Sequence, residues 1–280
     1  MAEDLNIRFS EEQYATKAEV KKALNCNLIE PIFKKINEYR NVYRKKVFVK
    51  NYTGLTFDVC FLKSINLKLE NFKKEFEKFN EKYQRETNPL NKQNYVVNNI
   101  LLFKEIYKDE SLDRNFATTL IVNKFEFLGS DNEKKKISSY FKTLDFLRSK
   151  ENEEVNEKFL LNLYRYYSNN NEENFRENEV VDPYEIVNLT SLEKGASPDR
   201  ISDLILSLTE FLEKKEFDDL FKAIIVFFFI NFVKPFGDRN KEISILLSRF
   251  ILSKKYKDFA LYIFPFDSKN LMRILLFDHL

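Results

Sequence analysis

Residues Lys234 to Glu242 make up the stretch of the sequence best suited to chemistry. A strongly apolar run over 223–233 comes directly before it, and a second helix is expected to begin near Asn240. The first turn of a helix presents unpaired backbone N–H groups and a partial positive charge, so it attracts anions. Arg239 and Lys241 add positive side chains at that turn. An anion site and an ordinary capped turn between two helices both explain these residues.

Two further residues of this stretch bear on its chemistry. Asp238 is a candidate ligand for a divalent cation, because proteins commonly hold Mg²⁺ with a carboxylate beside bound phosphates. Lys234 opens the stretch, and its side chain is protonated at neutral pH because the ordinary pKa of lysine is about 10.4. A protonated lysine cannot accept a proton as a general base.

Most other catalytic motifs are missing from the sequence. The chain has one histidine, His279, which excludes His-rich metal sites and argues against Ser-His-Asp catalysis. No two of its four glycines are close enough for a glycine-rich phosphate loop. Cys26 and Cys60 lack a metal-binding spacing, and we interpret them as reduced thiols of a cytoplasmic protein.

The composition predicts a folded protein with no global electrostatic preference. Of the 280 residues, 44% are hydrophobic and 32% are charged, which supplies a core and argues against disorder. A net charge of +2 gives no overall attraction to nucleic acid, so we expect no nucleic-acid partner; any such binding would need a local patch. The polar N-terminus is unlike a signal peptide, and the run over 223–233 is shorter than the roughly 20 residues that span a membrane. We therefore expect a cytoplasmic protein without a membrane partner.

Apolar residues recur at helical spacing along most of the chain, so we predict a mainly α-helical fold. The predicted helices are two within 10–46, then 60–85, 92–108, 111–127, 131–149, 153–168, one opened by Ser197 as cap, 217–233, 240–252 and one from Asp267. Two segments are expected to be extended: residues 46–60 form a short hairpin or an extended excursion, and the β-branched residues 175–192 form a β-hairpin or an extended flap. The helix over 60–85 is either a coiled coil that forms a homodimer or a core-facing helix; fewer than about three heptads favour the second.

The 234–242 stretch resembles the signature of the Fic (Fido) family, His-Pro-Phe-x-Asp/Glu-Gly-Asn-Gly-Arg-x-x-Arg. The two align without a gap. Four positions keep the family residue: Pro235, Phe236, Asp238 and Asn240. Five positions depart from it: Lys234 at the catalytic histidine, Arg239 and Lys241 at the two glycines, and Glu242 and Ile245 at the two arginines.

The resemblance also reaches upstream of the signature. Segment 175–181 resembles the hairpin flap that lines up a target segment by strand addition, so Val180 and Val181 are candidate target-binding residues. Many members carry an inhibitory Ser-x-x-x-Glu helix where this chain has 122–126. Glu126 matches the glutamate of that helix, whereas Val122 does not match the serine.

The architecture that the resemblance implies is all-α. A Fic-like helical core with a short β-hairpin flap would occupy residues 111–280. A helical N-terminal extension over residues 1–110 would pack on that core.

Members of the family typically transfer AMP from ATP to a hydroxyl group of a target protein. The resemblance therefore implies ATP or another nucleotide with Mg²⁺ as cofactor, Asp238 as metal ligand, and a phosphate site at Arg239, Asn240 and Lys241. Lys234 lacks the required basicity, and Glu242 puts a negative charge where phosphate charge must be neutralised. We expect no catalytic residue here, and a pseudoenzyme that binds or regulates a protein partner through its flap and groove.

The alternative is a nucleotide- or phosphate-dependent transferase with a rebuilt loop. In that case, Lys234, Arg239 and Lys241 would bind phosphates by side-chain charge, and Asp238 with Asn240 would hold a metal. A third hypothesis leaves the Fic-like part passive and assigns the 60–85 helix to a structural homo-oligomer.

Overall fold

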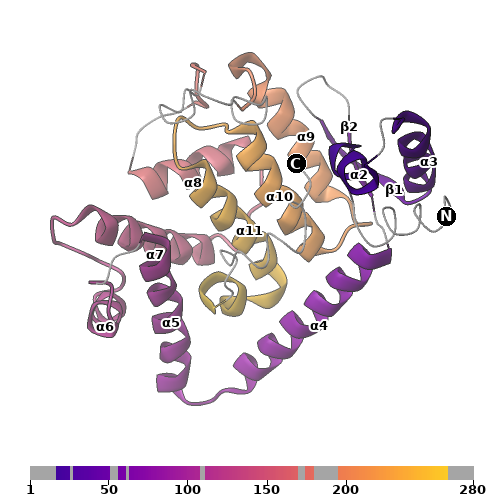
Figure 1. Cartoon of the computed structure of the whole chain (residues 1–280). Helices are drawn as coiled ribbons and strands as arrows, with labels where there is room; N and C mark the ends of the chain where they lie inside the picture. The colour runs from indigo at the N-terminus through magenta and orange to yellow at the C-terminus, as the bar shows by residue number, and fades with distance from the viewer. Residues whose placement is uncertain are drawn as a thin grey trace. The chain divides into compact units, whose positions relative to one another are not determined.

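The computed structural model describes residues 17–25, 28–50, 56–60, 63–107, 111–169, 174–179 and 195–263. They fall into two compact units, one ending at Lys78 and one beginning at Phe79. Helices make up most of the described chain, so the predicted fold class is confirmed (Figure 1). None of the described helices combines the length and the hydropathy that crossing a bilayer requires.

The first unit contains two short helices and a hairpin. Its helices are α2 (Lys17–Leu24) and α3 (Glu30–Asn41), which share a small core of Val20, Ile29 and Ile36. Strands β1 (Arg44–Lys50) and β2 (Thr56–Cys60) pair antiparallel, with Arg44 opposite Cys60 and an irregular register between Lys46 and Lys50. The hairpin predicted within 46–60 is therefore confirmed. Helix α4 (Lys63–Arg85) leads into the second unit.

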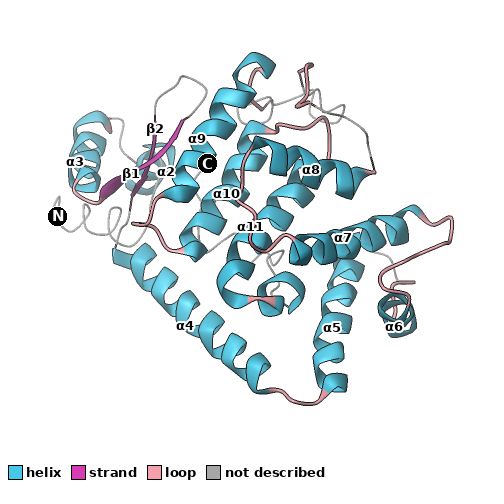
Figure 2. Ribbon diagram, turned by 180° about the vertical axis from the view of Figure 1, so that it is seen from behind, coloured by secondary structure: helices cyan, strands magenta, loops and turns pink. Residues whose placement is uncertain are grey.

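The second unit is a bundle of helices around a buried pair. In order, its elements are α5 (Pro89–Tyr107), α6 (Arg114–Val122), α7 (Asn132–Ser149), α8 (Glu157–Ser168), a 3₁₀ turn η2 (Pro198–Arg200), α9 (Ile201–Glu213), α10 (Asp219–Val233), α11 (Asn240–Tyr256) and a π-helical turn η3 (Phe259–Ile263). Both views place α10 and α11 in the middle, with α9 against α10 and both α7 and α8 against α11 (Figure 2).

Helix α10 is the centre of this core because it has no polar face. Of its 15 residues, 11 are buried, as the apolar sequence predicts. Asp218 caps its N-terminus by accepting a hydrogen bond from the Phe221 N–H at 2.9 Å. Packing on all sides fixes the position of this helix. The loop that follows it therefore begins from the buried residue Val233.

Two local predictions are wrong. Ser197 does not cap a helix through its side chain, which instead contacts Asp199, and a 3₁₀ turn separates it from α9. The helix predicted over 111–127 ends at Val122, because Lys124 and Phe125 take left-handed φ values of 51° and 62°. The Phe125 ring stacks on Phe141, with centroids 5.3 Å apart, so packing on α7 competes with continuation of the helix.

Several predictions are not tested by these elements. Residues 174–179 contain no strand, and the rest of the flap segment, with Val180 and Val181, lies outside the described residues, as does the helix predicted from Asp267. The domain boundary after residue 110 stays a prediction, although α5, which precedes it, packs on α6, α7 and η3. The homodimer stays a prediction too; on α4, Phe76 is buried and Phe79 is 58% exposed.

Candidate functional site

The loop between α10 and α11, residues 234–239, is the candidate site and is called the motif loop. It begins and ends with a left-handed residue: Lys234 has φ 49° and ψ 62°, and Arg239 has φ 57° and ψ 20°. The Lys234 N–H still bonds the Ile230 carbonyl oxygen at 2.9 Å, so Lys234 closes α10. Non-glycine residues adopt this conformation only at a cost in free energy, so the motif loop holds it against local preference.

Asn240 fixes the two ends of the motif loop to each other. Its Oδ1 accepts a hydrogen bond from the Phe236 N–H at 3.0 Å, and its Nδ2 donates to the Phe236 carbonyl oxygen at 2.9 Å. One side chain thus satisfies both backbone groups of a loop residue. The predicted cofactor-binding residue Asn240 therefore uses both ends of its amide within the loop.

Phe236 anchors the motif loop in the core. Its side chain is 1% exposed, and its ring stacks on Tyr164 of α8 with centroids 4.2 Å apart and planes at 7°. Phe175 meets the same ring edge-on at 5.7 Å. The Tyr164 hydroxyl also donates to Asp238 Oδ1 at 2.8 Å, so α8 holds the loop by an aromatic stack and a hydrogen bond.

Arg176 is a buried arginine at the start of the motif loop, with 9% of its surface exposed. Its Nε donates to the Lys234 carbonyl oxygen at 2.6 Å and its Nη1 to the Asn178 carbonyl oxygen at 2.7 Å, while Nη2 bonds the Ala196 carbonyl oxygen. The carbonyl of Lys234 lies at the C-terminal end of α10, where the helix dipole is negative. The guanidinium therefore joins three separate chain segments at the loop.

Backbone hydrogen bonds reinforce this junction. The Arg176 N–H bonds the Pro235 carbonyl oxygen at 3.0 Å, and the Ala196 N–H bonds the Val233 carbonyl oxygen at 2.9 Å. Gly195 has φ 72°, and a side chain there would lie 3.0 Å from the Lys234 Cβ. Residues 176 and 196 are thus both held at the start of the motif loop.

Asp238 and Arg239 are the charged tip of the loop. The Asp238 side chain is 64% exposed, and its Oδ2 lies 3.4 Å from Arg239 Nε. The Arg239 guanidinium lies over the Tyr167 ring at 5.4 Å from the centroid. Within the described residues, no three His, Cys, Asp or Glu side chains gather to hold a metal ion, so a cation here would rest on Asp238 and an added phosphate.

The remaining predicted site residues lie apart from this tip or outside the described chain. Lys241 is exposed on the first turn of α11. Glu126 follows the end of α6 and pairs with Lys142 of α7, with 3.5 Å between Oε1 and Nζ. Val180 and Val181 are not described.

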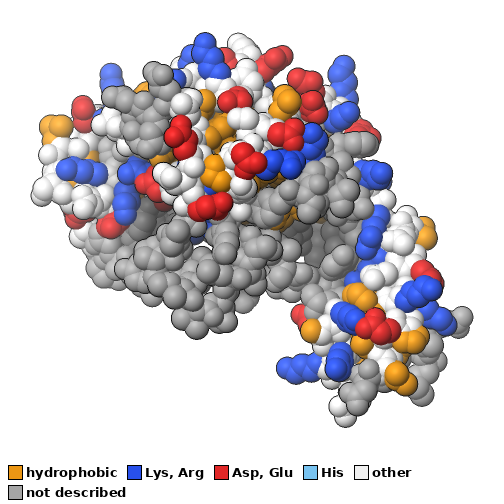
Figure 3. All heavy atoms as spheres, turned by 90° about the horizontal axis from the view of Figure 1, so that it is seen from above, with side chains coloured by type: hydrophobic (Ala, Val, Ile, Leu, Met, Phe, Trp, Pro, Cys, Tyr) orange, Lys and Arg blue, Asp and Glu red, His pale blue; other side chains and the backbone are white. Residues whose placement is uncertain are grey.

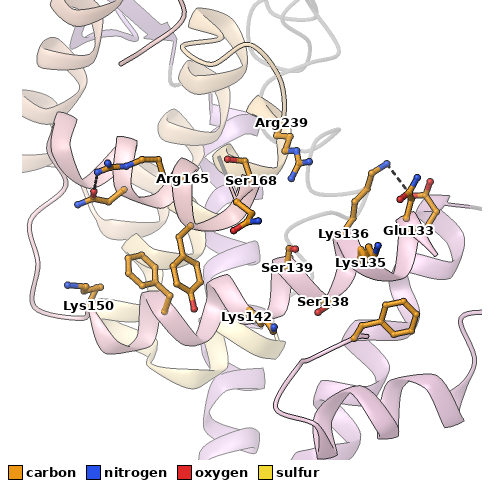
Figure 4. Close-up of a pocket in the computed structure, with 16 residues that line it drawn as sticks. Glu133, Lys135, Lys136, Ser138, Ser139, Lys142, Lys150, Arg165, Ser168 and Arg239 are labelled. Carbon is orange, nitrogen blue, oxygen red and sulfur yellow. Dashed lines mark hydrogen bonds and ion pairs between the residues drawn. The ribbon is translucent and has the colours of Figure 1, made fainter. Parts of the chain in front are cut away.

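A wide hollow of about 1130 Å³ lies between α7 and α8, and Arg239 reaches it from the motif loop (Figure 4). We call it the basic groove. Figure 4 shows Ser139 and Lys136 of α7 below it, with Arg239 and Ser168 on the opposite side. Its positively charged lining residues are Lys135, Lys136, Lys142, Lys150, Arg165 and Arg239, and its one acidic lining residue is Glu133.

Sequence reasoning missed Arg176, Tyr164 and the basic groove. Arg176 was assigned to the flap, and nothing in its neighbours marks it as buried. Tyr164 belongs to a predicted helix, but the partner 74 positions later cannot be read from helical periodicity. The sequence does contain a run of three lysines at 134–136, and Lys135 and Lys136 of this run line the groove.

No family model matches the chain, and neither does any curated protein. Among solved structures, a Fic family protein from Desulfovibrio desulfuricans G20 matches with a TM-score of 0.53 and 19% identity over 70% of this chain and 60% of that one. A Fic domain containing signaling protein from Bacteroides thetaiotaomicron VPI-5482 matches with a TM-score of 0.49 and 16% identity, over 65% of this chain and 72% of that one.

The first match identifies the fold as the Fic type, and the resemblance drawn from residues 234–242 is thereby supported at the level of the fold. The match spans 60% of the length of the Desulfovibrio protein. At 19% identity, it says nothing about the activity of this chain.

Proposed function

We propose that this chain is a Fic-fold pseudoenzyme, which lacks AMP-transferase activity and acts by binding a protein partner or regulating an active relative. The observation that carries the proposal is that the polar groups of the motif loop are engaged within the fold. Asn240 bonds Phe236, Tyr164 bonds Asp238, and Arg176 bonds the Lys234 carbonyl. These contacts hold the loop in place, which accounts for the retained motif residues by their part in the fold.

The first position of the motif supports the same conclusion. Transfer to a hydroxyl group needs a residue that removes the hydroxyl proton, and this chain has a lysine, Lys234, where the signature has its histidine. The described part of the chain contains no histidine that could stand in for it.

The phosphate side of the loop is also altered. Lys241 places a bulky side chain where the signature has glycine, and Glu242 places a carboxylate where it has arginine. Loss of one preorganised donor to a transition-state anion typically costs about 3–4 kcal/mol. A carboxylate at that position would repel phosphate as well.

An AMP-transfer assay tests the proposal. Purified protein is incubated with α-³²P-labelled ATP and Mg²⁺, alone and with lysate proteins, beside a Lys234→Ala variant. We expect no label on any polypeptide that depends on the added protein. Label that appears with the wild type and disappears with Lys234→Ala would overturn the proposal.

The partner-binding part is tested by site-specific photo-crosslinking. A photoreactive residue at Val180 or Val181 is compared with one at Leu90, which is 68% exposed on α5. We expect one discrete crosslinked protein from the flap positions and none from Leu90. Equal crosslinking from all three positions would contradict a role for the flap.

A second candidate is a nucleotide- or phosphate-dependent transferase. Helix α11 has no side-chain cap at its N-terminus, and Arg239 and Lys241 flank that end. Thermal unfolding with ATP or GTP and Mg²⁺ tests it, since a ligand at 100 times its Kd adds about 2.7 kcal/mol of stability. A rise in Tm that is lost in Asp238→Ala would support this candidate, and no rise would dismiss it.

A further inference from the structure

The lining of the basic groove is more positively charged than the net charge of the chain suggests. The net charge is +2, and on the larger body in Figure 3 basic and acidic side chains are interspersed. In the groove, six cationic residues face a single acidic one. They come from α7, α8 and the motif loop, so the fold itself assembles the patch.

The ion pairs around the basic groove are exposed and weak. Four groove cations make such pairs: Lys136 with Glu133 at 3.2 Å, Lys142 with Glu126 at 3.5 Å, Lys150 with Glu153 at 2.6 Å and Arg239 with Asp238 at 3.4 Å; these side chains are 32% to 64% exposed. Exposed pairs of this kind contribute little to stability, so a bound anion can displace the carboxylates.

Two cations of the basic groove make no ion pair with any described residue. Within the residues that the structure describes, neither Lys135 nor Arg165 makes an ion pair; Arg165 donates instead to the side chain of Asn162. Their charge faces solvent without compensation. They are the groups best placed to make the first contact with a polyanion.

An aromatic pair lies in the same lining. Phe146 of α7 and Tyr166 of α8 stack with centroids 4.3 Å apart and planes at 15°. Both residues line the groove, and Tyr166 is 49% exposed. A ring that is fixed on one side and exposed in a cationic groove is a surface on which an unpaired base can stack.

The groove is long enough for a polymer. Its lining follows α7 from Asn132 to Lys150, which caps the helix, and the fifteen residue steps from Lys135 to Lys150 alone span about 22 Å. At roughly 3.4 Å per nucleotide, the spacing in a fully stacked strand, this length matches at most about six nucleotides. A single small anion would contact only a fraction of the lining.

We propose that the basic groove binds single-stranded nucleic acid. The lysine and arginine side chains contact the phosphates, Tyr166 stacks on a base, and the hydroxyl of Ser139 and the amide of Asn169 donate to sugar or phosphate oxygens. The aromatic pair favours this ligand over an acidic protein surface, which has no unpaired bases to stack. The proposal replaces the expectation from net charge, and it does not depend on whether the motif loop transfers AMP.

Fluorescence anisotropy of the full chain with a labelled 12-nucleotide oligo(dT) and an RNA of the same length tests the proposal. With about four phosphate contacts, the slope of log K against log salt is near −2.8, so binding should weaken on the order of 50-fold between 50 and 200 mM salt. No measurable binding at the lower salt concentration would overturn the proposal.

Paired variants locate the site. The double variant Lys135→Gln/Lys142→Gln removes two groove charges, and Lys82→Gln/Lys215→Gln removes two exposed charges outside the groove lining. The groove variant should flatten the salt slope by about 1.4, and the control should leave it unchanged. Equal effects from both variants would overturn the proposal.

Two further measurements separate nucleic acid from other polyanions. Tyr166→Ala should weaken oligonucleotide binding about tenfold without changing the salt slope, because stacking is not ionic. Poly-glutamate of equal charge should compete poorly. Competition as strong as that of unlabelled oligonucleotide, or an unaffected Tyr166→Ala variant, would instead assign the groove to an acidic protein and overturn the proposal.

Discussion

The motif loop and the basic groove share Arg239, but they differ in how their polar side chains are bonded. Those at the loop are mostly buried or hydrogen-bonded within the fold, and those at the groove are exposed. Around the loop, Arg176 is 9% exposed and bonds backbone carbonyls, and both ends of the Asn240 amide are engaged. Around the groove, the cations are paired to exposed carboxylates or to none. Polar groups that are buried and satisfied hold a fold together, whereas exposed and loosely paired ones can exchange their partners for a ligand.

The largest difference in the free energy of unfolding should come from replacing one aromatic residue in each region. Phe236→Ala removes a ring that is 1% exposed and stacked on Tyr164, so the free energy of unfolding should fall by about 3–5 kcal/mol. Tyr166→Ala in the groove should lower it by less than about 1 kcal/mol. Urea unfolding followed by circular dichroism measures both, and similar losses would show that the loop is not the more tightly packed region.

Replacing one arginine in each region compares how much a charged side chain contributes to the free energy of unfolding at the loop and at the groove. Arg176→Met leaves carbonyl groups of residues 178, 196 and 234 without their donor, and the free energy of unfolding should fall by about 3 kcal/mol. Arg165→Met should change it by less than about 0.5 kcal/mol. The same urea titration serves, and an unaffected Arg176 variant would contradict the role of Arg176 as the tie between segments.

A substitution at Arg239, the left-handed residue at the end of the loop, is expected to increase stability instead of lowering it. Arg239→Gly relieves a φ of 57°, so stability should rise by about 0.5–1 kcal/mol after the added entropy of the unfolded glycine is counted. Lys241→Gly, inside α11, should lower stability by about 1 kcal/mol. Differential scanning fluorimetry should thus give Tm shifts of opposite sign, and a lower Tm for Arg239→Gly would mean that its contacts with Asp238 and Tyr167 stabilise the loop by more than the relief of φ gains.

The smallest effect is expected from the lysines of the basic groove. Lys135→Gln and Lys142→Gln should each leave the free energy of unfolding within about 0.5 kcal/mol of the wild type, because their pairs are exposed or absent. This result would show that any loss of oligonucleotide binding in these variants is not a loss of folding. A destabilisation above about 1 kcal/mol would mean that the groove lysines support the fold.

Parts of the fold follow from sequence because their signal is local. Helix α10 is apolar on every side, and the paired strands β1 and β2 are rich in β-branched residues. The start of α11 near Asn240 follows from the break at Pro235. In each case, a short window holds all the information that decides the structure.

Other features depend on contacts between distant residues, which a single sequence does not display. The helix over 111–127 stops early because Phe125 packs on Phe141. Arg176 binds carbonyl groups 20 and 58 positions away, and no spacing rule anticipates that. The positive charge of the groove is not visible in the net charge of the chain, because acidic residues outside the groove lining offset it.

The junction made by Arg176 has a consequence for how this protein can change. Residues 176 and 196 bond to Pro235 and Val233, which are close neighbours in the chain. The two ends of the segment between residues 176 and 196 are therefore held close together. Lengthening such a closed segment adds little to its entropic cost, about 0.6 kcal/mol for each doubling. Residues 180–194 can therefore be exchanged or lengthened while the bonds that Arg176 and Ala196 make at the motif loop are kept.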